Sequence, residues 1–261
     1  MANIKTVEEV QVMREGGILL SNALQAAVDA AKPGVTMKQL DDIARGVIEA
    51  GGGTPSFLGY GSKSRPFPAT VCISRNEEVV HGLGNREIAL DEGDIVGLDI
   101  GCWYKGLCTD MAVTVPIGSI TKERATLLRI TYDSMMAGVN AAVIGNTVMD
   151  IAGAVEDVVP KGYGIVESLV GHGVGHQVHE APNVPNFRGK HFPKAPLLDG
   201  MCIAIEPMVT TGTHEVEVSD DEWTIVTADK SDAAHFEVTV AILPGGPEIL
   251  TPVPKVRGVT A

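Results

Sequence analysis

The sequence predicts an α+β protein with a single domain, residues 1–261, whose chain forms two similar halves of about residues 1–117 and 118–250. Two observations predict this arrangement. Each half opens with two segments in which apolar residues recur at the spacing of an α-helix, and then continues into alternating segments typical of β-strands. In both halves, two of the alternating segments carry an acidic residue. We therefore expect two half-repeats related by a pseudo-twofold axis.

The two expected helices of the first half have clear starts and stops. Thr-x-x-Glu at residues 6–9 and Thr-x-x-Gln at residues 36–39 are capping boxes, a pattern that opens helices. The first helix is expected to end before Pro33 and the second at Gly51. A loop rich in glycine, serine and proline follows, and strand-like segments begin near Thr70.

The second half repeats the helical pattern. Thr121 begins one expected helix and Thr147 another, and the second helix of each half lies in an interval of 17 residues between glycines, 34–51 and 145–162. Many helices have a threonine cap and a glycine stop, so this match is weak when taken alone. Joined to the matching acid-bearing strands, it supports two half-repeats.

Four acidic residues occupy matching places in the two halves. Asp99 and Glu206 each lie six residues after a glycine, and Asp110 and Glu237 follow on further alternating segments. Because side chains on a strand switch face at every residue, each acid shares a face with small or hydroxyl residues. The opposite faces of the later two segments suit a core and carry Met111, Val113, Val115, Val238, Val240 and Ile242. Two similar hairpins, each offering two carboxylates to a common centre, would hold a pair of divalent cations.

Histidines sharpen the case for a metal site. His172, His176 and His179 lie among glycines that disfavour a helix and let the backbone approach a ligand or a strand closely. A lone histidine is more often a packed or surface residue, but the glycines and the four acids favour His172 as a ligand. Carboxylates with one imidazole suit Mn, Fe, Co or Zn. Two such ions about 3.5–4 Å apart would support hydrolysis by a bridging water that acts as hydroxide near neutral pH.

Composition limits the partners and the compartment. The formal net charge of −13, with no basic run to offset it, argues against nucleic acid as the main partner. The N-terminus has no apolar signal core and no apolar stretch approaches ~18 residues, so we expect neither export nor a membrane span, but a cytoplasmic protein. The four cysteines form no CxxC pair and are expected to be reduced and buried.

These residues together resemble the methionine aminopeptidases, metal-dependent exopeptidases of the pita-bread fold, in which an antiparallel sheet is backed by helices. The resemblance runs from about Ile4 to about Ile242. Thirty residues lie between Glu206 and Glu237, and the chain begins directly at the catalytic fold, which together resemble a bacterial-style type I enzyme. The matching segments are 71–82, 93–99, Thr109-Asp110, 171–176, 179–182, 205–209 and 234–239.

The resemblance implies an activity and a set of metal ligands. The chain would hydrolyse the initiator methionine from nascent proteins and peptides, preferring a small second residue, by attack of a hydroxide that bridges two divalent ions. Asp110 and Glu237 would bridge both ions. His172 and Glu206 would complete one ion, and Asp99 would chelate the other.

The resemblance also implies roles in catalysis and substrate binding. Glu206 would handle the proton of the attacking water, and His179 would polarise the scissile carbonyl. His81 would contact the substrate near its amino end, and the free α-amine would sit at the Asp99 ion. The methionine side chain would enter an apolar slot formed by Tyr60, Phe67, Cys72, His81 and Trp223.

Three departures from the family pattern stand out. The segment 62–68 is longer than the usual pocket loop, and Val178 stands where a large aromatic residue is common, which would widen the pocket. His176 and His235 stand where other polar residues are more usual. His235 shares a strand face with Glu237, and we expect its ring to make a structural hydrogen bond rather than to bind metal.

Two alternatives stay open. An Xaa-Pro aminopeptidase or dipeptidase would share the fold, but such enzymes usually carry a sizeable extra domain, for which there is no room before Thr6. A catalytically silent binding module would have lost ligands, whereas all five ligand positions are filled here. The expected partners are nascent polypeptide N-termini at or near the ribosome, with no nucleic acid and no membrane, and the expected state is a monomer.

Overall fold

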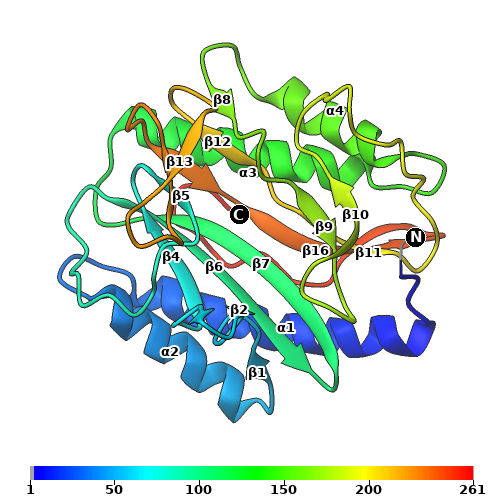
Figure 1. The fold of residues 1–261 in the computed structure, drawn as a ribbon, viewed down its shortest axis with the longest axis horizontal. Coiled ribbons are helices and arrows are strands. Elements are labelled where there is room, and N and C mark those ends of the chain that lie inside the picture. Colours follow the sequence, from blue (N-terminus) through cyan, green and yellow to red (C-terminus); the bar gives the residue numbers. More distant parts are fainter. Residues whose placement is uncertain (1–2, 261) are drawn as a thin grey trace.

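A computed structural model describes residues 3–260 of the chain as a mixture of helices and antiparallel strands. Figure 1 shows the sheet in the middle, with one helix pair along one side and a second pair along the other. The predicted α+β class is confirmed. The helices within the described residues are α1 (Val7–Ala30), α2 (Met37–Ala50), α3 (Lys122–Ala141) and α4 (Val148–Val158).

The predicted helix starts at 6–9 and 36–39 are confirmed by their hydrogen bonds. The Thr6 hydroxyl accepts from the Glu9 N–H at 3.2 Å, and the Glu9 carboxylate accepts from the Thr6 N–H at 2.8 Å. The pair at 36–39 repeats this geometry at 3.2 and 2.9 Å. Helix α4 ends at Val158 rather than continuing toward the glycine at 162, because the residue before Pro160 is pushed out of the helical region.

The main sheet has nine strands, and all of its pairings are antiparallel. Its strands are β1 (Thr54–Pro55), β4 (Val71–Arg75), β6 (Ile95–Tyr104), β7 (Leu107–Pro116), β9 (Gly171–Gly173), β10 (Glu180–Val184), β11 (Cys202–Ile205), β16 (Glu237–Leu243) and β17 (Gly246–Ile249). The order across the sheet is β1-β6-β7-β16-β11-β9-β10, with β4 also paired to β6 and β17 to β16. Strands β7 and β16 therefore join the first part of the chain to the second.

Smaller sheets surround this one. Strands β15 (Ala233–His235), β12 (Met208–Thr210) and β8 (Gly164–Ile165) form one of them, and β13 (Val216–Val218), β14 (Ile225–Thr227) and β5 (Glu78–Val80) form another. The segment after α2 contains a short hairpin of β2 (Gly61–Ser62) and β3 (Arg65–Pro66). In Figure 1, β5 and β13 lie at the left of the main sheet, β8 and β12 above it, and β2 at its lower edge near β1 and α2.

The expectation of two similar hairpins is half right. Strands β6 and β7 form a ten-pair hairpin that carries Asp99 and Asp110. Strands β11 and β16 pair side by side, but they are not a hairpin, because the chain passes through β12 to β15 between them. Glu206 also lies just beyond the end of β11 rather than within a strand. The division into halves at residue 117 stays a prediction.

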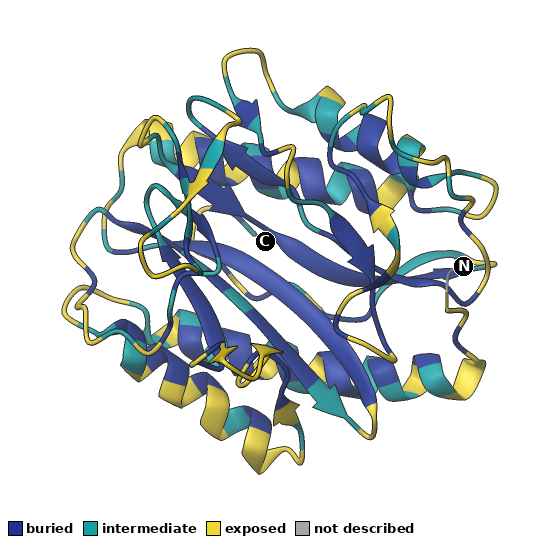
Figure 2. Cartoon of the chain, viewed as in Figure 1, coloured by how far each residue is buried: buried dark blue, intermediate teal, exposed yellow. Residues whose placement is uncertain are grey.

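The faces opposite the acids form the core, as predicted. Met111, Val113 and Val115 of β7 pack in the same buried cluster as Val238, Val240 and Ile242 of β16. Figure 2 shows these central strands buried along nearly their whole length. The four cysteines are free and buried, which confirms the expected thiol state. Among residues 3–260, no helix is both long enough and apolar enough to cross a membrane.

The glycines of the two N-terminal helices allow a matched test of packing. A Cβ atom added to Gly17 in α1 would overlap the carbonyl oxygen of Leu250, whereas one added to Gly46 in α2 meets nothing within 4 Å. We expect Gly17→Ala to destabilise the protein by about 1–3 kcal/mol through this overlap. Gly46→Ala should stabilise it by roughly 0.5–1 kcal/mol, because alanine loses less backbone entropy in a helix. Urea unfolding of both variants measures this, and effects of the same sign would contradict the packing described for α1.

Candidate metal and substrate site

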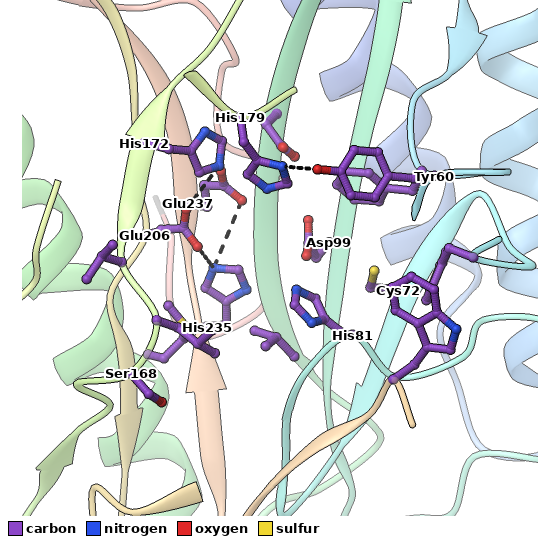
Figure 3. A pocket seen from close by; sticks show the side chains of 18 residues that line it. Tyr60, Cys72, His81, Asp99, Ser168, His172, His179, Glu206, His235 and Glu237 are labelled. Carbon is purple, nitrogen blue, oxygen red and sulfur yellow. Dashed lines mark hydrogen bonds and ion pairs between the residues drawn. The ribbon is translucent and has the colours of Figure 1, made fainter. Parts of the chain in front are cut away.

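One cavity of about 320 Å³ opens beside the acid-bearing strands. All eleven residues that were predicted from the sequence to form the site line this cavity. These residues are Tyr60, Phe67, Cys72, His81, Asp99, Asp110, His172, His179, Glu206, Trp223 and Glu237. Figure 3 shows how the lining side chains converge from different strands and loops.

Strand register explains why three of the acids meet. Ala112 of β7 is the direct partner of Asp99 on β6 and of Glu237 on β16. Partners in neighbouring strands point to the same face, so two carboxylates flank a methyl side chain that leaves room between them. Asp110 lies two residues before Ala112 and shares its face. A larger side chain at position 112 would fill the space in which these carboxylates meet.

Threonine hydroxyls bond β7 to its neighbours, to β16 through Thr239 and to β15 through Thr114. The Thr239 hydroxyl donates to the Asp110 carbonyl oxygen at 2.8 Å, and its oxygen lies 3.0 Å from the Asp110 N–H, which donates to it. The Thr114 hydroxyl is joined in the same way to the backbone of His235, at 2.8 and 2.9 Å. These bonds fix the backbone beside the acids without using the carboxylate oxygens.

Asp110 and Glu237 are buried, Asp99 and Glu206 are partly exposed, and the pKa values of all four are raised. Burial raises the pKa of Asp99 to about 7. Burial, and after it the neighbouring carboxylates, raises the pKa of Asp110, Glu206 and Glu237 well above the ordinary range. Asp99 Oδ1, Asp110 Oδ1 and Glu237 Oε1 have no hydrogen-bond partner within the described chain. Buried oxygens in this state fit a cation, because a positive charge would both pair them and favour their ionised forms.

Two groups of three donors come close enough to share an ion. One is Asp110, His172 and Glu237, and the other is Glu206, His235 and Glu237, with the donor atoms of each group within 4.8 Å of one another. Asp99 lines the same cavity but belongs to neither group. Glu237 is common to both groups.

The tautomer of His172 leaves a ring nitrogen with a lone pair that could bind a metal ion. Its Nδ1 lies 2.9 Å from the carbonyl oxygen of Gly173, to which it donates its proton, so Nε2 carries the lone pair. Burial lowers the pKa of His172 to about 4, which keeps the ring neutral. Nε2 lies 3.3 Å from Glu206 Oε1. A Cβ atom on the flanking Gly171 would overlap the Ala204 carbonyl oxygen, so the glycine permits this close approach of strands.

His179 is oriented by a tyrosine. The Tyr60 hydroxyl lies 2.7 Å from His179 Nδ1, and the two rings meet edge to face. Burial lowers the pKa of His179, which favours the neutral ring. When Tyr60 donates to Nδ1, the ring proton is on Nε2, where it can be given to a bound oxygen atom. The His179 ring also lies 4.4 Å from the His172 ring, so it stands directly beside the proposed metal donors.

His81 and His235 face the acids from the other side of the cavity (Figure 3). His81 has a left-handed backbone with φ of 59°, which is costly for a residue other than glycine and common at functional sites. The expected structural hydrogen bond of the His235 ring is not formed at Nε2. Its Nε2 has no partner within residues 3–260 and lies 3.7 Å from Glu206 Oε2 and 4.0 Å from Glu237 Oε2. The Thr114 hydroxyl forms hydrogen bonds with the backbone of His235 and not with its ring, and the ring faces the carboxylates.

The remaining wall of the cavity is apolar. The Phe67 ring packs edge to face against Trp223 at 5.2 Å, and the hairpin of β2 and β3 replaces the simple loop expected at 62–68. Val178 is buried in the apolar cluster behind the wall and does not line the cavity, so it does not widen the cavity directly. Lining residues that the sequence analysis did not identify are Phe57, Val80, Ser168, Leu169, Val170, Met208 and, as a side chain of the cavity, His235. Apart from its histidine, this set carries no pattern that separates it from ordinary core residues.

Comparison with known proteins agrees with this geometry. The model of metallopeptidase family M24 matches residues 11–244. The chain is 46% identical to the methionine aminopeptidase of Clostridium acetobutylicum, over 96% of this chain and 99% of that protein. It is 40% identical to methionine aminopeptidase 1 of Mycobacterium tuberculosis, over 95% and 94%. These matches confirm the resemblance described from the sequence.

Solved structures give the same result for the fold. The crystal structure of the methionine aminopeptidase of Thermotoga maritima superposes with a TM-score of 0.91 at 36% identity, over 96% of this chain and 99% of that one. A prolidase from Pyrococcus furiosus superposes with a TM-score of 0.75 at 20% identity, over 97% of this chain and 66% of that one. The second likeness concerns the fold alone. The pita-bread fold is thereby confirmed.

The raised pKa of Asp99 leads to a pH-dependent prediction for the metal-free protein. Below about pH 4 this carboxyl is protonated in the folded and the unfolded state and imposes no penalty. As the pH rises from 3.8 to about 7, only the unfolded state can ionise freely, so folding stability is lost. Asp99→Asn removes this penalty. We expect the variant to be more stable than the parent by about 2–4 kcal/mol at pH 8, with a gap that shrinks toward pH 4.5.

Urea unfolding in the presence of a chelator, at pH 4.5 and pH 8, measures this gap. Asp91→Asn is a matched control, because Asp91 is an exposed aspartate whose side chain pairs with Arg75 at the surface. A difference between the Asp99 variant and the parent that does not change with pH would contradict the burial argument.

Proposed function

We propose that this chain, which belongs to metallopeptidase family M24, hydrolyses the N-terminal methionine from peptides and nascent proteins. One observation carries the proposal: four carboxylates and four imidazoles line a single cavity together with an apolar wall. The buried donors suit metal-assisted hydrolysis, and the apolar, aromatic wall suits a thioether side chain.

The cofactor we propose is a pair of divalent ions of Mn, Fe, Co or Zn. Asp110 and Glu237 would bridge the pair, in keeping with the unpartnered oxygen that each carries. His172 and Glu206 would complete one ion, and Asp99 the other. When bound, such ions polarise the substrate carbonyl and make the attacking water acidic.

The protein side chains would handle the protons and the substrate. Glu206 would accept the proton of the attacking water, a role supported by its place in the cavity and by the 3.3 Å between its Oε1 and the Nε2 of the proposed ligand His172. His179 would donate from Nε2 to the carbonyl oxygen on which charge develops, a role supported by the Tyr60 contact to its Nδ1. His81 would contact the amino end of the substrate, whose α-amine would lie at the Asp99 side of the site.

The methionine side chain would occupy the apolar wall formed by Tyr60, Phe67, Cys72 and Trp223. The Phe67 ring, which packs against Trp223, would make a sulfur–aromatic contact with the substrate methionine. Small second residues such as alanine, glycine and serine would follow the methionine. The natural substrate would be a nascent chain in the cytoplasm, near the ribosome, and the enzyme would act as a monomer.

The Xaa-Pro alternative is not favoured. The proline-specific neighbours share the fold at 20% identity, whereas relatives at 40% identity and above are methionine aminopeptidases. A binding module without catalysis is also disfavoured, because all five ligand positions keep donor side chains in the cavity.

The direct test of the activity uses two peptides. The protein is treated with a chelator, reloaded with Mn or Co, and incubated with Met-Ala-Ser and with Ala-Pro-Ala. We expect metal-dependent release of methionine from the first peptide and no cleavage of the second. Cleavage of the proline peptide alone, or of neither peptide, would reject the proposal.

Asp110→Asn tests the bridging position. The substitution removes one charge between the two proposed ions while keeping size and fold, so methionine release should fall by about a hundredfold or more. Circular dichroism and thermal unfolding check that the fold is kept. Turnover close to that of the parent would show that Asp110 is not a bridging ligand.

His179→Ala tests the proposed donor to the carbonyl oxygen. Turnover should fall by about 10²–10³-fold, the usual loss when one such donor is removed. Metal content, measured by plasma emission on dialysed protein, should stay at the parental value, because His179 is not among the proposed ligands. Parental turnover, or a loss of metal equal to the loss of activity, would remove the proposed role.

A further inference from the structure

A buried lysine, Lys5, pairs with the residue that directly follows His179. The side chains of Lys5 and Glu180 are 1% and 2% exposed, and Lys5 Nζ lies 2.7 Å from Glu180 Oε2. The two residues are 175 positions apart in the chain. Glu180 directly follows His179 and begins β10. This pair therefore ties the N-terminal segment to the residue next to the proposed carbonyl donor.

Both oxygens of Glu180 are engaged. Oε2 receives Lys5 Nζ, and Oε1 accepts from the N–H of Gln177 at 2.8 Å. The peptide that carries His179 is therefore closed into a short loop between Gln177 and Glu180. Burial raises the pKa of Glu180, but the hydrogen bonds from Lys5 and Gln177 outweigh it, and its pKa is lowered overall.

Lys5 is itself held by the main chain. Its N–H donates to the Gly200 carbonyl oxygen at 2.8 Å, and its Nζ also donates to the Asn3 carbonyl oxygen at 3.0 Å. A Cβ atom at Gly175 would overlap the Lys5 side chain, so this loop packs directly on the lysine stem. The lysine thus occupies a fixed position against the loop that leads to His179.

A second link joins the same two segments at the surface. His176 Nε2 lies 2.8 Å from Glu9 Oε1, and Glu9 also closes the capping box of α1. This contact is partly exposed, so it contributes less than the buried pair. The buried pair matters more, because removing one partner leaves an uncompensated charge in the interior.

We propose that Lys5 is a positioning residue for His179: through Glu180 it fixes the loop that aims the imidazole at the substrate carbonyl. This inference rests on the proposed function, since it gives His179 a task in turnover. The alternative is that the pair only stabilises the fold, in which case its loss would affect turnover independently of His179.

A double-mutant cycle separates the two cases. Lys5→Met should lower kcat for Met-Ala-Ser by about tenfold, since small misplacement of a catalytic group is costly, while KM and metal content stay close to parental values. Lys5→Arg should restore part of the loss. When Lys5→Met is added to His179→Ala, kcat should change by less than about twofold, because the group being positioned is absent.

Lys105→Met is the matched control, because Lys105 forms an ion pair of the same 2.7 Å length with Glu15 at the surface. It should leave kcat unchanged in both backgrounds. If Lys5→Met does not fold, the double change Lys5→Met with Glu180→Gln removes both buried charges and keeps an acceptor for Gln177, and the cycle is run with that pair.

The outcomes are distinct. The inference would be overturned if Lys5→Met lowered kcat by the same factor in the parental and the His179→Ala backgrounds, or did not lower kcat in the parental background. The proposed function would stand in both cases. Failure of the parent to release methionine, or parental turnover in His179→Ala alone, would instead reject the proposed function or the role of His179, and the inference would fall with it.

Discussion

The convergence of four carboxylates in one cavity determines how the surrounding elements are arranged. Strands β6 and β16 flank Ala112 with Asp99 and Glu237, while Asp110 and Glu206 approach from neighbouring positions. Asp110 and Glu237 are buried, Asp99 and Glu206 are partly exposed, and like charges oppose the joint ionisation of all four. A cation resolves this conflict, and the apolar faces on the other side of the same strands supply the packing that offsets the cost of burying the acids.

The parts of the site that are not acids follow from that arrangement. Threonine hydroxyls bond the backbone of β7 to that of its neighbours, so the carboxylates need not do so. Glycines around His172 bring its strand close, and the Gly173 carbonyl selects the tautomer whose lone pair faces Glu206. Tyr60 acts on His179 in a comparable way from the opposite wall. The imidazoles are therefore set by backbone and hydroxyl contacts rather than by one another.

Local patterns allowed much of this to be predicted from the sequence. Capping boxes located the starts of α1 and α2, and strict alternation placed Asp110 and Glu237 opposite a core face. The separation of β11 from β16 by smaller strands was not predictable, because alternation indicates strands but not which of them pair. The His235 ring and Phe57 were missed as cavity residues for a similar reason, and the partnership of Lys5 with Glu180 depends on contacts that no local pattern encodes.

Anomalous diffraction can show whether these carboxylates bind metal ions. Crystals grown with saturating Mn are measured on both sides of the Mn absorption edge. We expect two anomalous peaks about 3.5–4 Å apart, between Asp110 and Glu237. One should lie beside Asp99 and the other beside His172. Anomalous peaks only elsewhere on the protein, with none among the four carboxylates, would contradict it.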